Sequence, residues 1–395
     1  MNAGKAISSI IVAASILATG WYFRNRKRSP TGSRAASPSI ESGITAAEVF
    51  KAEDISDAEL RGLIGMKPKV ELHCHLNGSV RTATLDELLT GESGPSDDGI
   101  VHTIEDAFRQ FKRVYQAINK EARLRRIVRE TLEDAISDNI RYIELRTTPR
   151  KLDDVATRKE YVRIVVDEIG RFDRLNKQTP LKSFPAGTIA ARLILTIDRT
   201  QSVALAEQTV DIALRHRDIV VGIDFAGNPT IGTFAEFVSV FMRAKGHGLF
   251  TTVHTSEIRG VETETQAILD FGPHRVGHFL FPTEGQIQQL KESGIFIEAC
   301  PTSNICAISG KSPPHGDVNG HHILDRFVRD PHLLLGINTD DPGVFGKSLS
   351  DELFAVAKTF KLTGKELDGL ILNNAKHAFL SESERKYLVA ALSNS

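Results

Sequence analysis

The chain has 395 residues, of which 41% are hydrophobic and 25% are charged, and this composition is that of a globular protein with a sizeable core. Its 49 basic and 50 acidic side chains leave a formal net charge of −1. A global positive field that would bind nucleic acid is therefore excluded. Cys74, Cys300 and Cys306 are too few and too scattered for a disulfide framework, which favours a reducing compartment for the folded part.

Residues 1–28 differ in composition from the rest of the chain. An uncharged stretch from Ala6 to Phe23 is followed by a basic cluster that begins at Arg24. As a helix this stretch would reach about 27 Å, at the short end of what spans a bilayer, and the basic flank is typical of the cytoplasmic side. The sequence predicts a membrane anchor with everything after Arg24 in the cytosol. A mitochondrial outer-membrane anchor, a cleaved secretory peptide, and a soluble cytosolic form without the extension stay open.

Residues 29–45 are polar and rich in Ser, Pro and Gly, so they are predicted to form a flexible linker. The folded domain is predicted over residues 46–395. It begins with two short amphipathic helical patterns before Pro68. A loop over Gly91–Gly99 and two further helices, over 103–118 and 122–136, are expected before the second strand.

Short β-branched runs alternate with longer helical stretches over the rest of the chain. Strands are expected at Val70–Cys74, Ile140–Leu145, Ala190–Ile197, Val220–Phe225, Phe250–His254, Arg275–His278, Phe296–Ala299 and Leu333–Ile337. This alternation predicts a parallel sheet, and eight strands over roughly 330 residues fit one barrel with insertions. The expected fold is an α/β (β/α)8 TIM barrel with N-terminal helices and a helical insertion after the first strand.

Polar or titratable groups follow one predicted strand after another. They are His73 and His75, Arg146 to Thr148, Asp198, Gly227 and Asn228, His254 to Glu257, His278, Cys300 to Asn304, and Asn338 to Asp341. The carboxyl ends of barrel strands converge on one face, where barrel enzymes build their sites. Any one of these segments alone is more often a turn or a satisfied core residue. Their recurrence at strand ends indicates an active site.

Three histidines and one aspartate in this set are candidate metal ligands. His73 and His75 stand two residues apart on a strand, so both point to one side, and Cys74 between them points to the other. His254 and Asp340 follow the fifth and eighth strands. Three neutral nitrogens and one carboxylate suit a single Zn²⁺ per subunit, with one position left for water. The alternative for the histidine pair is two core side chains satisfied by their neighbours.

These motifs together resemble the adenosine/AMP deaminase family of zinc barrels. The resemblance rests on His73-Cys-His75, on His254 with Glu257, on Gly277-His278 and on Thr339-Asp-Asp-Pro342, and it runs from about Lys67 to near the C-terminus. The chain is most similar to the adenosine deaminase-like branch, the N6-methyl-AMP deaminases, through HLNGS, LRTTP and GNP. Thr255-Ser256 departs from the family, which usually has a small residue and Gly there. A bulkier turn would narrow the pocket near the N6 substituent.

The resemblance implies hydrolytic deamination at C6 of a purine. Glu257 would protonate ring nitrogen N1, and His278 would orient and deprotonate the attacking water. A bound Zn²⁺ lowers the pKa of its water to about 7. By the same resemblance, Asp341 would hold the imidazole edge of the purine, and Gly227 would offer its backbone to the other edge.

Asn77 bears on whether the substrate carries a phosphate. Enzymes that act on free adenosine resemble this chain but have Asp at this position, and a carboxylate about 4 Å from a phosphate would cost about 4 kcal/mol per unit charge at an effective dielectric of 20. Thr147, Thr148 and Arg150 could supply hydroxyls and a positive charge to the phosphate. Alternatively, these three residues start a helix and lie at the surface.

The sequence therefore favours the conversion of N6-methyl-AMP to IMP and methylamine. Adenosine deamination, and a membrane-tethered purine-binding protein without catalysis, are the alternatives. The expected partner is a small purine nucleotide, and a monomer that binds no nucleic acid is expected.

Overall fold

The computed structural model describes residues 50–89, 104–176, 189–309 and 318–393. Ala46–Ser395 forms one compact unit. No helix within the described ranges is long and apolar enough to cross a membrane. The predicted anchor over 1–28, the predicted linker over 29–45 and the Gly91–Gly99 loop all lie outside these ranges, so they stay predictions.

Eight parallel strands form one sheet, and each strand pairs with the next one along the chain. The strands are β1 (Lys69–His75), β2 (Ile140–Thr147), β3 (Ala190–Asp198), β4 (Val220–Ala226), β5 (Phe250–Thr255), β6 (Arg275–His278), β7 (Phe296–Ala299) and β8 (Leu335–Ile337). The predicted (β/α)8 barrel is confirmed, and every predicted strand end lies within two residues of the observed one.

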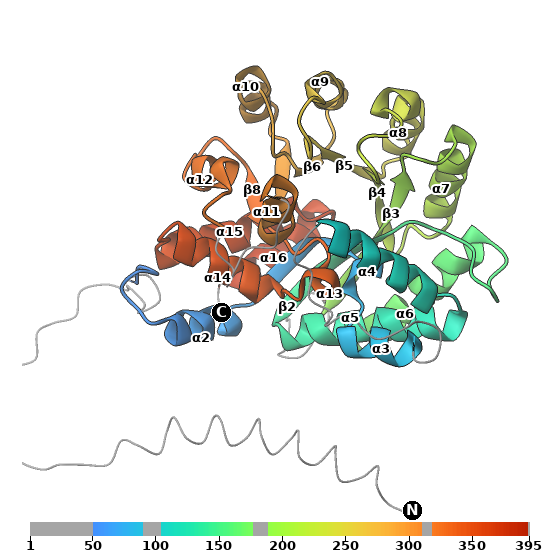
Figure 1. Ribbon diagram of the computed structural model, residues 1–395, viewed down its shortest axis with the longest axis horizontal. Coiled ribbons are helices and arrows are strands. Elements are labelled where there is room, and N and C mark those ends of the chain that lie inside the picture. Colours follow the sequence, from blue (N-terminus) through green and yellow to red (C-terminus); the bar gives the residue numbers. More distant parts are fainter. Residues whose placement is uncertain (1–49, 90–103, 177–188, 310–317, 394–395) are drawn as a thin grey trace, which may run out of the picture. The chain divides into compact units, whose positions relative to one another are not determined.

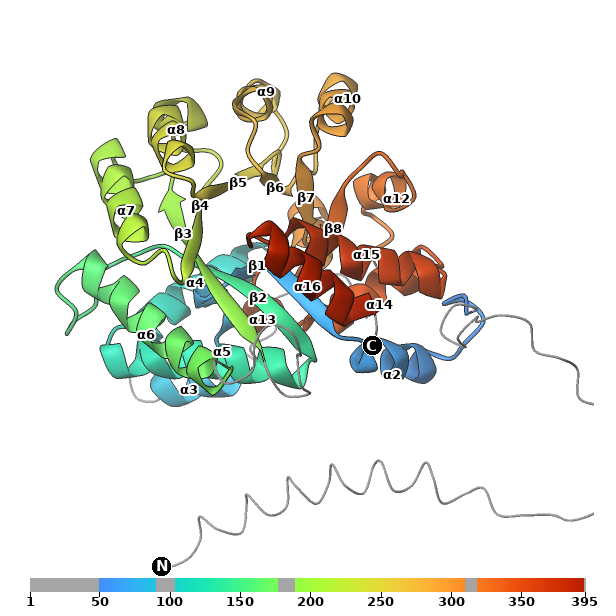
Figure 2. The ribbon, with the colours of Figure 1, turned by 180° about the vertical axis from the view of Figure 1, so that it is seen from behind.

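The helices surround the sheet (Figures 1 and 2). Before β2 they are α2 (Asp57–Met66), η2 (Asn77–Ser79), α3 (Thr82–Leu89), α4 (Ile104–Ala117) and α5 (Glu121–Ser137). Between β2 and β8 they are α6 (Arg158–Asn176), α7 (Val203–Arg215), η3 (Phe234–Phe237), α8 (Val238–Gly246), α9 (Glu262–Phe271), α10 (Glu284–Ser293), α11 (Pro301–Ser309) and α12 (His322–Val328). After β8 come α13 (Pro342–Phe345), α14 (Leu349–Thr359), α15 (Gly364–His377) and α16 (Glu382–Ser393).

Of the two helices expected before β1, the described residues contain α2, and residues 46–49, where the first was expected to begin, lie outside the described ranges. Ser56 caps α2 through a capping box with Glu59, as its sequence pattern predicts. Upstream of α2, the described residues form a bridge and a turn: Lys51 pairs with Thr363, and the Ala52 N–H donates to the Leu362 carbonyl at 2.8 Å. The N-terminal part of the domain is therefore tied to the connection between α14 and α15.

Backbone hydrogen bonds close the barrel between β1 and the residues after β8. The His75 N–H donates to the Asp340 carbonyl at 2.7 Å, and the Asp340 N–H donates to the His73 carbonyl at 2.8 Å. Closure therefore fixes the backbone of three predicted metal ligands directly.

Side-chain amides add further hydrogen bonds to this junction between β1 and β8, which we call the closing seam of the barrel. Helix α15 packs on both β1 and β8 (Figure 2). Its residue Asn374 donates through Nδ2 to the Val70 carbonyl at 2.7 Å and to the Ile337 carbonyl at 2.8 Å. Asn338 Oδ1 accepts from the Leu72 N–H at 3.0 Å. These amides satisfy strand groups that a regular ladder would otherwise pair.

Substitution of Asn374 by Ala should lower the free energy of unfolding by roughly 2–4 kcal/mol, because it leaves two buried carbonyls without a donor. The adjacent variant Asn373→Ala is the control, since Asn373 is half-buried and donates to the single carbonyl of Leu335 at 3.1 Å. Asn373→Ala should lower the free energy of unfolding by about 1 kcal/mol or less. Urea denaturation of both variants measures the difference, and equal losses would refute the role of Asn374 in the seam.

Candidate active site

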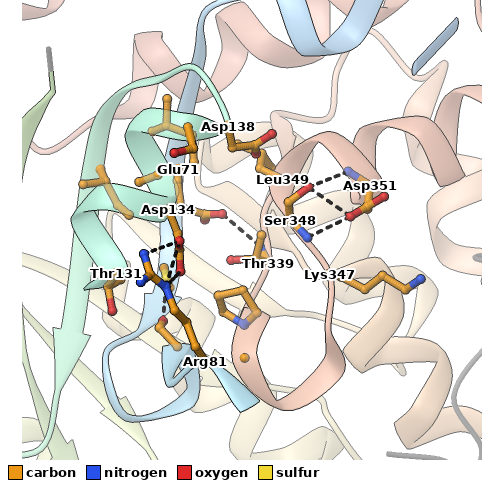
Figure 3. A pocket seen from close by; sticks show the side chains of 18 of the residues that line it. Glu71, Arg81, Thr131, Asp134, Asp138, Thr339, Lys347, Ser348, Leu349 and Asp351 are labelled. Atoms are coloured by element: carbon orange, nitrogen blue, oxygen red, sulfur yellow. Dashed lines mark hydrogen bonds and ion pairs between the residues drawn. The ribbon is translucent and has the colours of Figure 1, made fainter. Parts of the chain in front are cut away.

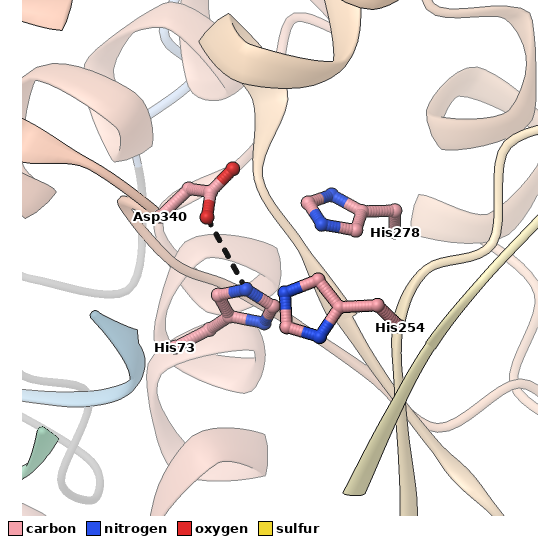
Figure 4. Close-up of side chains that lie close together, drawn as sticks. All are labelled: His73, His254, His278 and Asp340. Carbon is pink, nitrogen blue, oxygen red and sulfur yellow. Dashed lines mark ion pairs between the residues drawn. The ribbon is translucent and has the colours of Figure 1, made fainter. Parts of the chain in front are cut away.

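Histidine and aspartate side chains from β1, β5, β6 and the end of β8 converge inside one mouth of the barrel. Nitrogen or oxygen atoms of His73, His254, His278 and Asp340 all lie within 4.8 Å of one another, and Figure 4 shows these side chains directed toward a common centre. His75 joins them, because its Nε2 lies 3.2 Å from His254 Nε2 and 3.3 Å from Asp340 Oδ1.

The donor set fits a transition-metal ion. His73 Nε2 is buried and makes no hydrogen bond within the described part of the chain, although it lies 3.3 Å from Asp340 Oδ1. Burial lowers the pKa of His75 well below its usual value, so this ring is neutral near pH 7. Neutral imidazoles and one carboxylate are ligands that Zn²⁺ and its neighbours in the periodic table accept.

Two buried carboxylates orient two of these rings. Glu298 Oε2 lies 2.6 Å from His73 Nδ1, and Asp224 Oδ1 lies 3.0 Å from His254 Nδ1. Each carboxylate accepts the proton on Nδ1, so each neutral ring directs its Nε2 lone pair into the cluster. Such carboxylate–histidine pairs are typical of metal centres.

Two buried arginines keep Glu298 ionised. Burial alone would raise the pKa of Glu298, but the positive charges of Arg146 and Arg275 and the hydrogen bond to His73 hold that pKa well below its usual value. Arg146 lies 2.8 Å from Glu298 Oε2, and Arg275 lies 2.5 Å from Glu298 Oε1. The charge that orients His73 is therefore balanced inside the barrel.

The backbone is strained where these side chains leave the strands. His278, Asp340 and Ser256 have φ values of 64°, 63° and 56°, in the left-handed region that residues other than glycine seldom adopt. Each such residue costs on the order of 1–3 kcal/mol and persists only where its surroundings enforce it. The strain lies at the ends of β5, β6 and β8, where it aims side chains into the cluster.

A cavity of about 440 Å³ opens over the cluster. Ten of the twelve residues to which the sequence analysis assigned a catalytic, metal-binding or substrate-binding role line it: His75, Asn77, Thr147, Thr148, Gly227, His254, Glu257, His278, Asp340 and Asp341. His73 is fully buried beside the rings of His254 and His278. Apolar wall residues come from α4 and α13, among them Phe111, Tyr115 and Phe345.

Arg150 is not among the residues that line this cavity. Its guanidinium lies over the ring of Tyr115 at 4.8 Å and donates to the Ile118 carbonyl at 2.8 Å. The predicted phosphate contact of Arg150 therefore stays a prediction. The side chain holds the C-terminal end of α4 in place.

Asp341 and Gly78 are matched in shape. A Cβ atom on Gly78 would lie 1.7 Å from Asp341 Oδ1, so only glycine leaves room for this carboxyl. Burial and the neighbouring charge of Asp340 raise the pKa of Asp341 well above its usual value. The higher pKa favours the protonated form of Asp341, and in that form the carboxyl can donate a hydrogen bond into the cavity.

Sequence reasoning assigned no role to four residues that support the site. Glu298 and Asp224 orient His73 and His254, while Ser303 Oγ donates to Asp340 Oδ2 at 2.6 Å and Asn304 lies 2.8 Å from His278 Nδ1. A signal existed for the two carboxylates, since each interrupts a short apolar strand. Ser303 and Asn304 lie in the segment after the seventh strand, which the sequence analysis singled out as a whole, but no pattern indicated which histidine or aspartate each one contacts.

A second cavity, of about 520 Å³, lies between α5 and the segment that follows β8 (Figure 3). Cys74 lines it, which confirms that Cys74 points away from the histidine cluster. Its polar side chains are paired with each other: Arg81 lies 2.7 Å from Asp134, and Ser348 donates to Asp351 at 3.0 Å. None of the residues to which the sequence analysis assigned a catalytic, metal-binding or substrate-binding role lines this cavity.

The fold and the cluster define a class: a barrel hydrolase with a candidate metal centre at the carboxyl ends of its strands. The family described as adenosine deaminase matches residues 68–395, and the chain belongs to this family. The adenosine deaminase-like protein of Drosophila pseudoobscura pseudoobscura is 35% identical over 81% of this chain and 94% of its own length. The N6-mAMP deaminase of Arabidopsis thaliana is 35% identical over 76% of this chain and 88% of its own.

A solved structure is similar over the same region. The Arabidopsis protein ADAL in complex with IMP is 32% identical, with a TM-score of 0.72, and the match covers 84% of this chain and 97% of that protein. The predicted membership of the adenosine deaminase family is confirmed.

Glu352 supports the site from outside the barrel. It is 1% exposed, and its Oε2 accepts from the backbone N–H of Thr302 at 3.1 Å in the first turn of α11, which carries Ser303 and Asn304. Burial raises the pKa of Glu352 to about 8. In the unfolded chain the Glu352 carboxyl has its ordinary pKa of 4.5 and loses its proton above that pH. In the folded protein it keeps this proton up to a pH of about 8.

This difference predicts a pH-dependent effect of Glu352→Gln. Because the folded state binds the extra proton, the wild type loses stability relative to the variant as the pH rises from about 5 to about 8, by roughly 4 kcal/mol. Urea denaturation at both pH values measures the change. The control is Asp351→Asn, whose carboxyl has a lowered pKa and is ionised in both states over this range. A gap between wild type and Glu352→Gln that stays constant would contradict the prediction.

Proposed function

We propose that the protein deaminates a 6-aminopurine nucleoside 5′-monophosphate by hydrolysis, and that N6-methyl-AMP, which yields IMP and methylamine, is its preferred substrate. The observation that carries this proposal is the convergence of the histidine–aspartate cluster, Glu257 and Asp341 in one cavity. Membership of the adenosine deaminase family, relatives named N6-mAMP deaminase and a related structure with IMP support it.

His73, His75, His254 and Asp340 would hold one Zn²⁺ per subunit in this proposal. The ion would supply a Lewis acid that makes water nucleophilic near neutral pH. The chain supplies the orientation: Glu298 and Asp224 fix two of the rings, and Ser303 holds the second oxygen of Asp340.

Glu257 would hold and move the proton that purine N1 requires. Its side chain lines the cavity, is 25% exposed, and places Oε2 3.8 Å from His278 Nε2. Ser256, with its φ of 56°, turns the chain between the end of β5 and Glu257. A carboxyl held over the purine ring can protonate N1 as C6 accepts the oxygen nucleophile.

The purine itself would lie between Asp341 and Gly227. A protonated Asp341 donates to an imidazole nitrogen of the base, which fixes which face of the ring meets the cluster. Gly227, whose φ is 112°, lines the cavity through its backbone, and a Cβ there would lie 2.8 Å from Asp198. A flat base can therefore approach this segment closely.

The phosphate would bind near Asn77, Thr147 and Thr148, which line one side of the cavity. Asn77 is 7% exposed, and its Oδ1 makes no hydrogen bond within the described residues. Thr147 Oγ1 lies 2.9 Å from the hydroxyl of Tyr161, which fixes the orientation of the threonine. A neutral amide at position 77 avoids the repulsion that a carboxylate would exert on a phosphate.

Turnover of N6-methyl-AMP, AMP and adenosine by the full-length chain tests the substrate. We expect N6-methyl-AMP to have the highest kcat/KM. Asn77→Asp should lower this value by about tenfold or more, because the added charge costs about 1–4 kcal/mol near a phosphate. The kcat/KM for adenosine, which has no phosphate, should fall much less in the same variant. The variant Asn77→Ala separates the added charge from the lost amide, and it should cost less than Asp. Faster turnover of adenosine than of both nucleotides would refute the phosphate assignment.

Glu257→Gln should reduce kcat by on the order of 10²–10⁴, because the amide cannot deliver a proton to N1. Metal content, measured on the same samples, should equal that of the wild type. The matched control is Glu262→Gln, an exposed residue in the first turn of α9. It should keep nearly the wild-type rate. Substantial turnover by Glu257→Gln would remove this residue from the role of acid.

A further inference from the structure

A chain of buried hydrogen bonds runs from the start of α12 to the catalytic cavity. The backbone N–H of Leu324 points at His321 Nδ1 at 3.1 Å, His321 Nε2 lies 2.9 Å from the side-chain amide of Asn304, and that amide lies 2.8 Å from His278 Nδ1. His321 and Asn304 are each 1% exposed, and His278 is 5% exposed.

The backbone end of this chain fixes the first proton. A backbone N–H can only donate, so His321 Nδ1 must accept and carries no proton. A ring whose second nitrogen also accepted would be an imidazolate, which does not form near neutral pH. His321 therefore carries its proton on Nε2 and donates it to Asn304.

That donation determines the orientation of the Asn304 amide. With Nδ2 facing His321 and Oδ1 facing His278, as these atoms are placed in the structure, two donors would meet at 2.9 Å in a buried place. Since the oxygen and nitrogen of a side-chain amide have nearly the same size, the hydrogen-bond network decides between the two orientations. Asn304 therefore presents its oxygen to His321 and its NH₂ group to His278 Nδ1.

We infer that Asn304 is a positioning residue that forces the neutral His278 ring to accept at Nδ1 and to carry its proton on Nε2, which faces Glu257. The inference concerns the roles within the proposed function but rests only on the hydrogen bonds from Leu324 to His278. It changes what His278 can do in the reaction.

With its proton on Nε2, His278 donates into the cavity and has no lone pair there. It can then orient the attacking water or stabilise negative charge on the oxygen, but it cannot take the proton of the water as a neutral base. It also cannot bind a metal ion through Nε2. Of the histidines that surround the cluster, His73, His75 and His254 are left as nitrogen ligands.

Nuclear magnetic resonance of the zinc-loaded full-length protein, labelled with ¹⁵N in its histidines, tests the inference without substrate. Long-range proton–nitrogen correlations distinguish protonated from unprotonated ring nitrogens, and the signals that vanish in His278→Gln assign His278. We expect a protonated Nε2 and an unprotonated Nδ1. The reverse pattern would overturn the inference, whether or not the enzyme deaminates N6-methyl-AMP.

The variant Asn304→Asp tests whether Asn304 sets this state. A carboxylate can accept from His321 but cannot donate to His278, so Nδ1 of His278 should gain a proton. The control Asn373→Asp makes the same exchange at a half-buried position on α15 and should leave the His278 signals unchanged. A His278 Nδ1 that stays unprotonated in Asn304→Asp would overturn the role of Asn304.

Metal content gives a second readout. His278→Gln should retain about one zinc ion per chain, because the ring is a donor and not a ligand. His75→Gln should lose most of its zinc under the same dialysis. Loss of zinc from His278→Gln with retention in His75→Gln would overturn the inference, and neither result depends on turnover.

Discussion

Glu298 is a carboxylate buried inside the barrel, and its two oxygens are shared among Arg146, Arg275 and His73. Burial of a single unpaired charge costs several kcal/mol, so this group is tolerated only because two guanidiniums surround it. The same bonds hold His73 in one tautomer and one orientation. The ion pairs inside the barrel and the candidate metal centre therefore depend on the same carboxylate.

The closing seam of the barrel adds a second constraint on the same residues. His73 and His75 share backbone hydrogen bonds with Asp340, so β1 and the end of β8 cannot separate without disrupting the cluster. The positive φ of Asp340 is held by these bonds. Stability of the seam and geometry of the site are thus linked, and strain at the strand ends is compensated by closure of the barrel.

Residues outside the cavity decide the chemical states of residues inside it. Glu352 secures the start of α11, Asn304 on that helix meets His278, and His321 at the start of α12 meets Asn304. The direction of one backbone N–H, that of Leu324, thereby reaches the catalytic ring through two side chains. The donor at the start of α12 thus sets the tautomer of His278 in the cavity.

Local sequence patterns were sufficient to predict the barrel and most of the site, because the position of a residue on a strand or at its end specifies which face it lies on. Buried parallel strands read as short β-branched runs, and in a barrel the residue that follows such a run must lie on the catalytic face. His73, His75, His254, Glu257, His278, Asp340 and Asp341 were found by this rule together with the family resemblance, and the structure brings them together.

Tertiary structure alone decided which partners these residues have. Arg150 follows a strand as the others do, yet its guanidinium packs over the ring of Tyr115 and is not among the groups that line the cavity. Glu298, Asp224 and Asn304 contact histidines that are distant in the chain, and no spacing rule encodes such pairs. Strand order and alternation specify on which face a side chain lies. Its hydrogen-bond partner, its tautomer and its charge depend on which other segments pack against it.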